Sequence, residues 1–186
     1  GDTPLQSARL KPTRVGRGES LTMVWLDPKS GVQASPTTVT DLRLPAMAVP
    51  SPPRFHESGV ELYRLADSKS VGGVLANKKG EVVSLWAGFT YDMGKSNKPW
   101  FAGLPIEVAL STLEALRSGE PTHPSLGLLL NAITPVDAAA RGLTAESLRA
   151  LSAVRAQPML LEVRRVMPGT EAGEKLRPGD ILLELN

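Results

Sequence analysis

Short apolar runs separated by turn-forming residues fill residues 10–85, and this pattern constrains the fold more than any other feature of the sequence. Runs of this length, interrupted by Pro, Gly, Asn, Asp and Ser, are typical of antiparallel β-strands. The candidate strands are residues 21–26, 37–44, 59–65, 73–76 and 81–89. Residues 77–80, Asn-Lys-Lys-Gly, form a tight hairpin between the last two, because Asn and Gly tolerate the positive φ that such turns need. Several short strands in this order predict a small barrel.

The apolar spacing changes to a helical period after these strands. Pro105 suits a first helical turn, where its missing N–H is not needed, and Gly119 and Pro121 end the pattern. The apolar face of this helix is expected to carry Ile106, Ala109, Leu110, Leu113 and Leu116. We therefore predict a helix over residues 104–118 and a linker with a domain boundary at 119–124.

The remaining sequence predicts a second, smaller unit that is again rich in strands. Residues 126–133, 159–166 and 181–185 are apolar extended runs. Residues 144–153 have a helical pattern that begins at Thr144, a residue type that caps helix N-termini. A helix therefore separates the first two strands of this unit.

Composition excludes several kinds of chemistry. The chain has no cysteine, which removes disulfides, thiolate zinc sites and cysteine nucleophiles. It has only two histidines, so metal ligation and acid/base catalysis have few candidates, and we predict neither a metal nor a cofactor. Lys plus Arg number 21 against 19 Asp plus Glu, and they are scattered, so nucleic acid is not an expected partner. No apolar stretch is long enough to predict a membrane span.

One passage carries a family resemblance. The residues Val-Gly-Gly-Val-Leu at 71–75, followed by a turn and Glu-Val-Val-Ser-Leu-Trp at 81–86, resemble the active-site region of trypsin-like proteases. Barrel strands precede this passage, and a helix that begins Ala-Gly-Leu-Pro at 102–105 follows it. Ser-Leu-Gly-Leu at 125–128 and Arg-Pro-Gly-Asp-Ile-Leu at 177–182 come next. This order is similar to that of the HtrA protease family.

The resemblance implies a mainly β chain. It consists of the second, six-stranded trypsin-like barrel at residues 1–104, a helix and linker at 105–124, and an incomplete PDZ domain at 125–186. The PDZ domain is expected to be incomplete because its second helix and closing strand do not fit before Asn186. The resemblance also implies a periplasmic or cell-envelope location and assembly as a homo-oligomer that includes an upstream barrel.

The resemblance places a degenerate nucleophile loop at Lys69, Ser70, Val71, Gly72 and Gly73. The family's serine aligns with Val71, which has no hydroxyl, and Lys69 replaces a glycine whose N–H helps to bind the oxyanion. A shift of the nucleophile to Ser70 or Ser68 is the alternative.

A displaced serine would still need an oriented base. In the HtrA family the histidine and aspartate come from the first barrel, which would precede Gly1. His56, beside Glu57, and His123, in the linker, are interpreted as ordinary polar residues. We therefore predict no catalytic residue in this chain.

The resemblance places the peptide-binding loop of the PDZ domain at Ser125, Leu126, Gly127 and Leu128, leading into a binding strand. A PDZ domain adds an extended C-terminal peptide to a sheet edge, and loop N–H groups receive the terminal carboxylate. An unremarkable buried strand is the alternative. The insert at 131–157 is longer than expected for the family and could cover the groove.

These observations lead to one leading interpretation and one alternative. The leading interpretation is a non-catalytic HtrA-like segment, such as the degenerate second unit of a tandem protein. It would serve regulation, assembly or the binding of peptides and unfolded protein C-termini in protein quality control. The alternative is a fragment of an active HtrA-like serine endopeptidase whose histidine and aspartate lie upstream.

Overall fold

The chain divides into two compact units. The computed structural model describes residues 7–43, 60–92, 97–119, 125–154 and 159–184. The first unit contains a barrel and a helix, and the second contains a small sheet with three short helices. The Pro-rich stretch 45–53 and both histidines, His56 and His123, lie outside the described residues.

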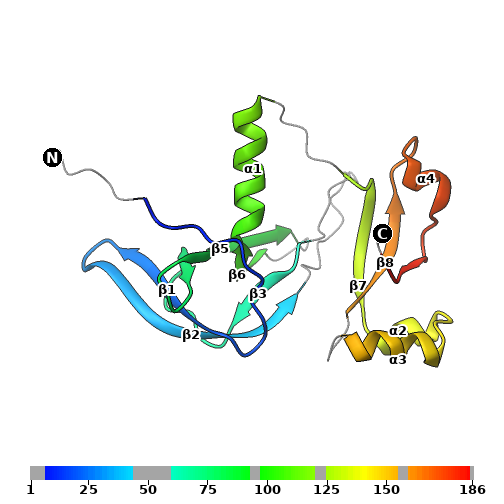
Figure 1. The fold of residues 1–186 in the computed structure, drawn as a ribbon, viewed down its shortest axis with the longest axis horizontal. Coiled ribbons are helices and arrows are strands. Elements are labelled where there is room, and N and C mark those ends of the chain that lie inside the picture. The colour runs from blue at the N-terminus through cyan, green and yellow to red at the C-terminus, as the bar shows by residue number, and fades with distance from the viewer. Residues whose placement is uncertain (1–6, 44–59, 93–96, 120–124, 155–158, 185–186) are drawn as a thin grey trace. The chain divides into compact units, whose positions relative to one another are not determined.

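The first unit is a closed barrel of six antiparallel strands (Figure 1). The strands are β1 (Ser20–Asp27), β2 (Gly31–Arg43), β3 (Leu62–Leu65), β4 (Gly73–Ala76), β5 (Val82–Asp92) and β6 (Asn97–Pro105). Around the barrel they follow the order β1-β2-β3-β6-β5-β4, and β4 closes it by pairing with β1. The predicted mainly β class and the six-stranded barrel are confirmed.

Alternating side chains of the strands fill the barrel. In β1, Leu21 and Met23 are buried while Thr22 and Val24 are only partly covered, as the period of two in a strand requires. The core is aliphatic except for two aromatic rings. Its members are Val15, Leu21, Met23, Val39, Tyr63, Leu75, Val83 and Trp86.

The predicted hairpin between β4 and β5 is confirmed, and its geometry explains why Asn begins it. The Asn77 side-chain oxygen accepts hydrogen bonds from the N–H groups of Lys79 and Glu81, at 2.9 and 3.0 Å. Gly80 alone in this turn has a positive φ, of 75°. The Asn side chain therefore acts as the acceptor that holds the turn, while Gly supplies the left-handed conformation.

The sixth strand, β6, has no counterpart among the five candidate strands. It pairs with β5 over nine successive positions, from Asp92 opposite Asn97 to Ser84 opposite Pro105. Helix α1 (Ile106–Ser118) therefore starts two residues later than predicted, and Pro105 is its extended N-cap residue, with φ −51° and ψ 136°. Pairing with β5 overrides the helical pattern at its first two positions.

The predicted apolar face of α1 is covered only at its start. Ile106 is buried against the barrel, whereas Leu113 and Leu116 are exposed. Gly119 ends the helix in a left-handed conformation, with φ 72°. The predicted end of the helix at Gly119 is therefore confirmed.

None of the helices in the described ranges is long and apolar enough to span a membrane.

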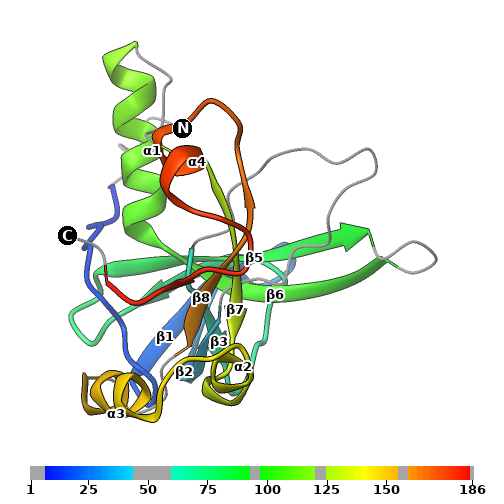
Figure 2. The same ribbon diagram turned by 90° about the vertical axis from the view of Figure 1, so that its right-hand side faces the viewer.

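The second unit is a three-stranded antiparallel sheet in the order β7-β8-β9. Its strands are β7 (Leu128–Ile133), β8 (Leu160–Val166) and β9 (Ile181–Leu182). Helices α2 (Pro135–Ala140) and α3 (Ala145–Val154) lie near one end of the β7–β8 pair, and α4 (Glu171–Lys175) lies near the other end (Figure 2). The three predicted strands are present, each with a shorter range.

A small separate core joins the helices to this sheet. Ile133 and Leu160 pack with Ala138 of α2, and Leu148 and Leu151 of α3 cover them. The predicted cap of α3 is confirmed, because the Ser147 N–H donates to the Thr144 hydroxyl at 3.2 Å.

Helix α2 was not predicted, although its start signal is in the sequence. The Thr134 hydroxyl accepts a hydrogen bond from the Asp137 N–H, and the Asp137 carboxylate accepts one from the Thr134 N–H. This reciprocal pair is a capping box. Hydrogen bonds from Thr134 also lower the pKa of the Asp137 carboxyl below its usual range. The pair Thr134 and Asp137, followed by Ala138-Ala139-Ala140, is the signal that identifies this helix.

The close packing around Gly103 gives a stability prediction. A Cβ atom at Gly103 would lie 2.7 Å from the Ser84 hydroxyl oxygen and 3.1 Å from the Tyr63 Cβ, both inside the barrel. Gly103→Ala is expected to lower the free energy of unfolding by about 2–3 kcal/mol, the usual cost of overpacking a core. Urea unfolding measures this change. Gly16→Ala is the control, since no atom lies within 4 Å of its Cβ position, and an equal loss in both variants would contradict the explanation.

Candidate functional site

The predicted degenerate nucleophile loop connects β3 to β4 at the wall of the barrel. Its last residue, Gly73, begins β4 and lies opposite Trp86 of β5. Gly73 has a φ of 148°, and a Cβ atom there would lie 2.4 Å from the Val24 carbonyl oxygen of β1. Only glycine permits this approach, so the second glycine of the pair is required by the barrel itself.

Val71 occupies the most prominent position of the loop, and its side chain is 73% exposed. An aliphatic side chain has neither a nucleophilic atom nor a transferable proton. The position that the resemblance assigns to the serine therefore presents an apolar surface to solvent, which contributes no bond-making chemistry.

The serine hydroxyls of the loop are engaged with their own backbone. Ser70 Oγ donates to the Gly72 carbonyl at 2.7 Å and accepts from the Gly72 N–H at 3.3 Å. Ser68 Oγ donates to the Ser70 carbonyl at 2.9 Å. Each hydroxyl proton is thus directed to a carbonyl within two residues, which is the geometry of a structural turn.

A buried indole fixes the peptide group in the middle of the loop. Trp86 is almost fully buried, and its Nε1–H donates to the Ser70 carbonyl at 2.9 Å. In a trans peptide the carbonyl and the next N–H point in opposite directions. The Val71 N–H therefore points away from Trp86, and the orientation of this peptide is set by the barrel core.

The lysine at position 69 forms an exposed ion pair. Its Nζ lies 2.6 Å from the Asp67 carboxylate, and both side chains are more than half exposed. Pairs of this kind contribute about 0–1 kcal/mol. The Asp67 carbonyl accepts from the Thr37 hydroxyl of β2 at 2.9 Å, so the backbone at this end of the loop is also held by the barrel.

The described residues around this loop provide no metal site. Both histidines of the chain lie outside the described ranges. Within those ranges no group of three His, Cys, Asp or Glu side chains is placed to hold a metal ion. The described loop is therefore a well-held turn that ends in a required glycine.

The second predicted site, Ser125 to Leu128, forms the entry to β7. Gly127 has a φ of 65°, and its N–H donates to the Ser125 hydroxyl at 3.0 Å. The Gly127 carbonyl accepts from the Met167 N–H at 2.8 Å, which joins this loop to the end of β8. Leu126 is exposed, whereas Leu128 is buried.

β7 has one unpaired side in the structure. Across the described residues it pairs with β8 alone, so it is an edge strand of the sheet. An edge strand presents a row of N–H and C=O groups to which another strand can bind. The structure thus brings a left-handed glycine turn and a free strand edge together at residues 125–133.

Thr170 is a supporting residue of this turn that sequence reasoning missed. A Cβ atom at Gly127 would lie 3.0 Å from both the Thr170 hydroxyl oxygen and its methyl carbon. The Thr170 hydroxyl donates to the Met167 carbonyl at 2.8 Å and accepts from the Gly173 N–H at 3.2 Å. The sequence does contain a signal for the role of Thr170 as a helix cap, because Thr-Glu-Ala-Gly-Glu at 170–174 resembles the start of a helix.

Comparisons with curated proteins find related sequences. A PDZ domain-containing protein of Schizosaccharomyces pombe is 34% identical over 196 residues, which cover all of this chain and 19% of that protein. The pro-apoptotic serine protease NMA111 of Saccharomyces cerevisiae is 26% identical over 191 residues, which cover 98% of this chain and 19% of that protein. The chain is thus similar to a PDZ domain-containing protein and to a serine protease. The chain spans about a fifth of the length of these relatives.

Two solved structures of HtrA-type proteases are also similar to this chain. The protease AlgW with a decapeptide is 14% identical, with a TM-score of 0.47, and the match covers 93% of this chain and 49% of AlgW. An AlgW variant with a decapeptide gives 17% identity and a TM-score of 0.46, with coverage of 95% and 50%. No protein-family model matches the chain.

The Trp86 hydrogen bond gives a prediction for the loop before β4. Trp86→Phe keeps an aromatic ring but removes the buried indole donor from the Ser70 carbonyl, which retains the exposed Ser68 hydroxyl as a donor. We expect the free energy of unfolding to fall by about 2 kcal/mol and the amide hydrogens of residues 67–72 to exchange faster.

Hydrogen exchange with mass spectrometry measures the loop effect. Trp25→Phe is the matched control, because Trp25 packs against the same core and the structure gives its indole no hydrogen bond. Equal exchange of the loop in both variants would show that the Trp86 indole does not hold it.

Proposed function

We propose that this HtrA-like chain is non-catalytic and captures the C-terminal ends of peptides or unfolded proteins at the edge of β7. The observation that carries the proposal is the free edge of β7 directly after a left-handed glycine turn. This combination is the backbone geometry that strand addition requires. The name of the S. pombe relative, which refers to a PDZ domain, supports the same interpretation.

Capture would use the backbone of residues 126–133. A peptide that extends along β7 would exchange hydrogen bonds with the unpaired side of the strand. Its terminal carboxylate would reach the turn and accept from the Gly127 N–H, which now donates to the Ser125 hydroxyl. The Ser125 hydroxyl thus stands in for a carboxylate oxygen, and it would rotate away when a peptide binds.

The non-catalytic part of the proposal rests on the loop before β4. Val71 offers no nucleophile, and the hydroxyls of Ser68 and Ser70 donate to backbone carbonyls. Unactivated serine is a poor nucleophile, because no base takes its proton. A barrel of this type would then serve as a scaffold for assembly or regulation in protein quality control. The predicted domain limits and the cell-envelope location stay predictions.

Peptide capture predicts dependence on a free carboxylate. A fluorescent decapeptide with apolar C-terminal residues is expected to bind the 186-residue chain, and its C-terminal amide about tenfold more weakly, because one charge-assisted hydrogen-bond set is lost. Fluorescence anisotropy over a small peptide library measures the difference. Equal binding of acid and amide forms would contradict carboxylate capture.

Two glycine variants localise this binding. Gly127→Ala is expected to weaken it, because alanine at φ 65° is strained and its Cβ would press on Thr170. Gly142→Ala is the matched control: it has a positive φ of 96° in the same unit, but no atom lies near its Cβ position. If both variants bound the peptide equally, the site would not be at Gly127.

An active serine endopeptidase is the second candidate function. The printed name of the S. cerevisiae relative, a serine protease, favours it, since a histidine and an aspartate could come from segments beyond this chain. A fluorophosphonate probe distinguishes the two functions. We expect no adduct on the full-length protein under conditions that label trypsin fully, because Val71 has no hydroxyl and the hydroxyls of Ser68 and Ser70 donate to backbone carbonyls. An adduct mapped to Ser68 or Ser70 by mass spectrometry would overturn the non-catalytic proposal.

A further inference from the structure

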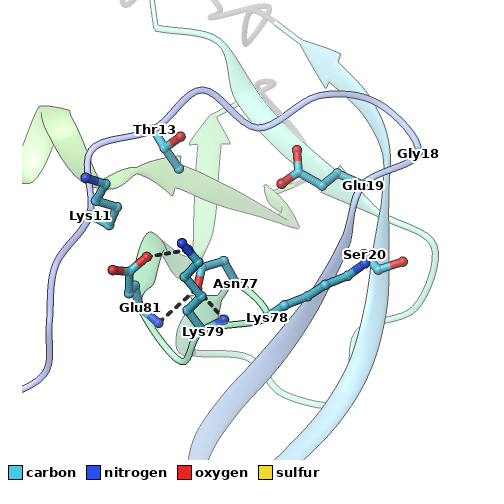
Figure 3. Close-up of a pocket in the computed structure, with 9 residues that line it drawn as sticks. All are labelled: Lys11, Thr13, Gly18, Glu19, Ser20, Asn77, Lys78, Lys79 and Glu81. Carbon is cyan, nitrogen blue, oxygen red and sulfur yellow. Dashed lines mark hydrogen bonds between the residues drawn. The ribbon is translucent and has the colours of Figure 1, made fainter.

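A polar cavity of about 510 Å³ lies on the barrel unit, away from the nucleophile loop (Figure 3). Three separate stretches of chain line it. They are the segment with Lys11 and Thr13, the turn before β1 at residues 18–20, and the β4–β5 hairpin. The cavity is large enough for several residues of a ligand, and its lining has none of the apolar side chains that a drug-like molecule needs.

Backbone hydrogen bonds hold the walls of this cavity. Lys11 N–H donates to the Val82 carbonyl at 2.8 Å, and the Val82 N–H donates to the Arg9 carbonyl at 2.8 Å. The turn before β1 is fixed in the same way, since Gly18 N–H donates to the Val39 carbonyl at 2.7 Å. The cavity is thus pre-formed, which reduces the entropy cost of binding.

Three lysines supply the cavity with positive charge. They are Lys11 on the N-terminal segment and Lys78 and Lys79 on the hairpin. Among the ion pairs of the described residues, none includes one of these three. Lys78 extends toward Ser20, while Lys11 stands on the other side of the hairpin (Figure 3). The positive charge is therefore spread across the cavity.

The two carboxylates of the lining are bound to donors of their own segments. Glu19 accepts from the Gly16 N–H at 3.0 Å, and Glu81 accepts from the Asn77 side-chain amide at 2.8 Å. Both therefore stabilise the turns that form the walls, and neither forms an ion pair with a lysine of the cavity. One positive charge remains in excess, with hydroxyl groups of Thr13 and Ser20 beside it.

We propose that this cavity binds an acidic polypeptide segment. Carboxylates spaced along an extended chain can reach Lys11 and Lys78 on its two sides, whereas one compact anion would reach only one side. Lysine forms point-charge contacts with carboxylates, and the cavity has no arginine to grip a phosphate with two parallel bonds. The hydroxyls and the Asn77 amide can meet the polar backbone of such a segment.

The test uses a fluorescent decapeptide of alternating Glu and Ser with an amidated C-terminus, titrated into the 186-residue chain. Binding is expected at 50 mM salt and should weaken as salt rises, because exposed charges are screened. The triple variant Lys11→Gln, Lys78→Gln, Lys79→Gln is expected to bind about tenfold more weakly, since three exposed charge pairs each contribute modestly.

Controls make each outcome decisive. Lys29→Gln, in the exposed β1–β2 turn and outside the lining, should leave binding unchanged, and thermal unfolding should show all variants folded. Equal weakening in Lys29→Gln and the triple variant would overturn the site, and equal binding of a Gln-Ser peptide would overturn its charge preference. Displacement by millimolar phosphate at constant ionic strength would assign the cavity to compact anions instead.

This site does not depend on peptide capture at β7. The amidated peptide has no terminal carboxylate, so a chain that fails at one site can still bind at the other. Gly127→Ala should leave acidic-peptide binding unchanged, and the triple lysine variant should leave capture of free C-termini unchanged. Parallel loss in both assays would instead show a general loss of folding.

Discussion

Backbone contact between β1 and β4 closes the barrel, and this contact depends on the absence of a side chain at Gly73. Any Cβ atom there would collide with the Val24 carbonyl. Closure in turn leaves no unpaired edge in a barrel of short strands. The β4–β5 hairpin places Trp86 beside β4, where its indole reaches the loop before Gly73. The loop and the core are thus parts of one arrangement, and the glycine is required whether or not the loop performs chemistry.

This arrangement separates what the fold requires from what catalysis requires. Gly73 and Trp86 are buried in or against the barrel, and changing either alters its packing. Val71 and Lys69 are exposed, and their side chains make no contact that holds the loop except one solvated ion pair. A barrel of this type can therefore keep its stability with a valine in the position of the nucleophile. That asymmetry supports the proposal of a non-catalytic barrel.

Much of the barrel could be predicted from local patterns, and the misses have specific causes. The β4–β5 hairpin and the end of α1 follow from Asn77, Gly80 and Gly119, whose preferences act within a few residues. β6 could not be found this way, because Pro99 and Gly103 resemble turn residues and the strand is held by pairing with β5. The indole bond of Trp86 and the support of Gly127 by Thr170 join residues distant in sequence, so no local pattern contains them.

The two proposed binding sites differ in how they recognise a chain. At β7 the recognition groups are mainly backbone N–H and C=O groups, which every peptide can satisfy, so a terminal carboxylate at Gly127 must supply the selectivity. In the lysine-lined cavity the recognition groups are side-chain charges. The number of acidic residues in the ligand therefore determines binding, and a free C-terminus is not needed. Each unit has its own core, so each proposed site is built on its own folded unit. The two sites can therefore recognise different parts of a polypeptide.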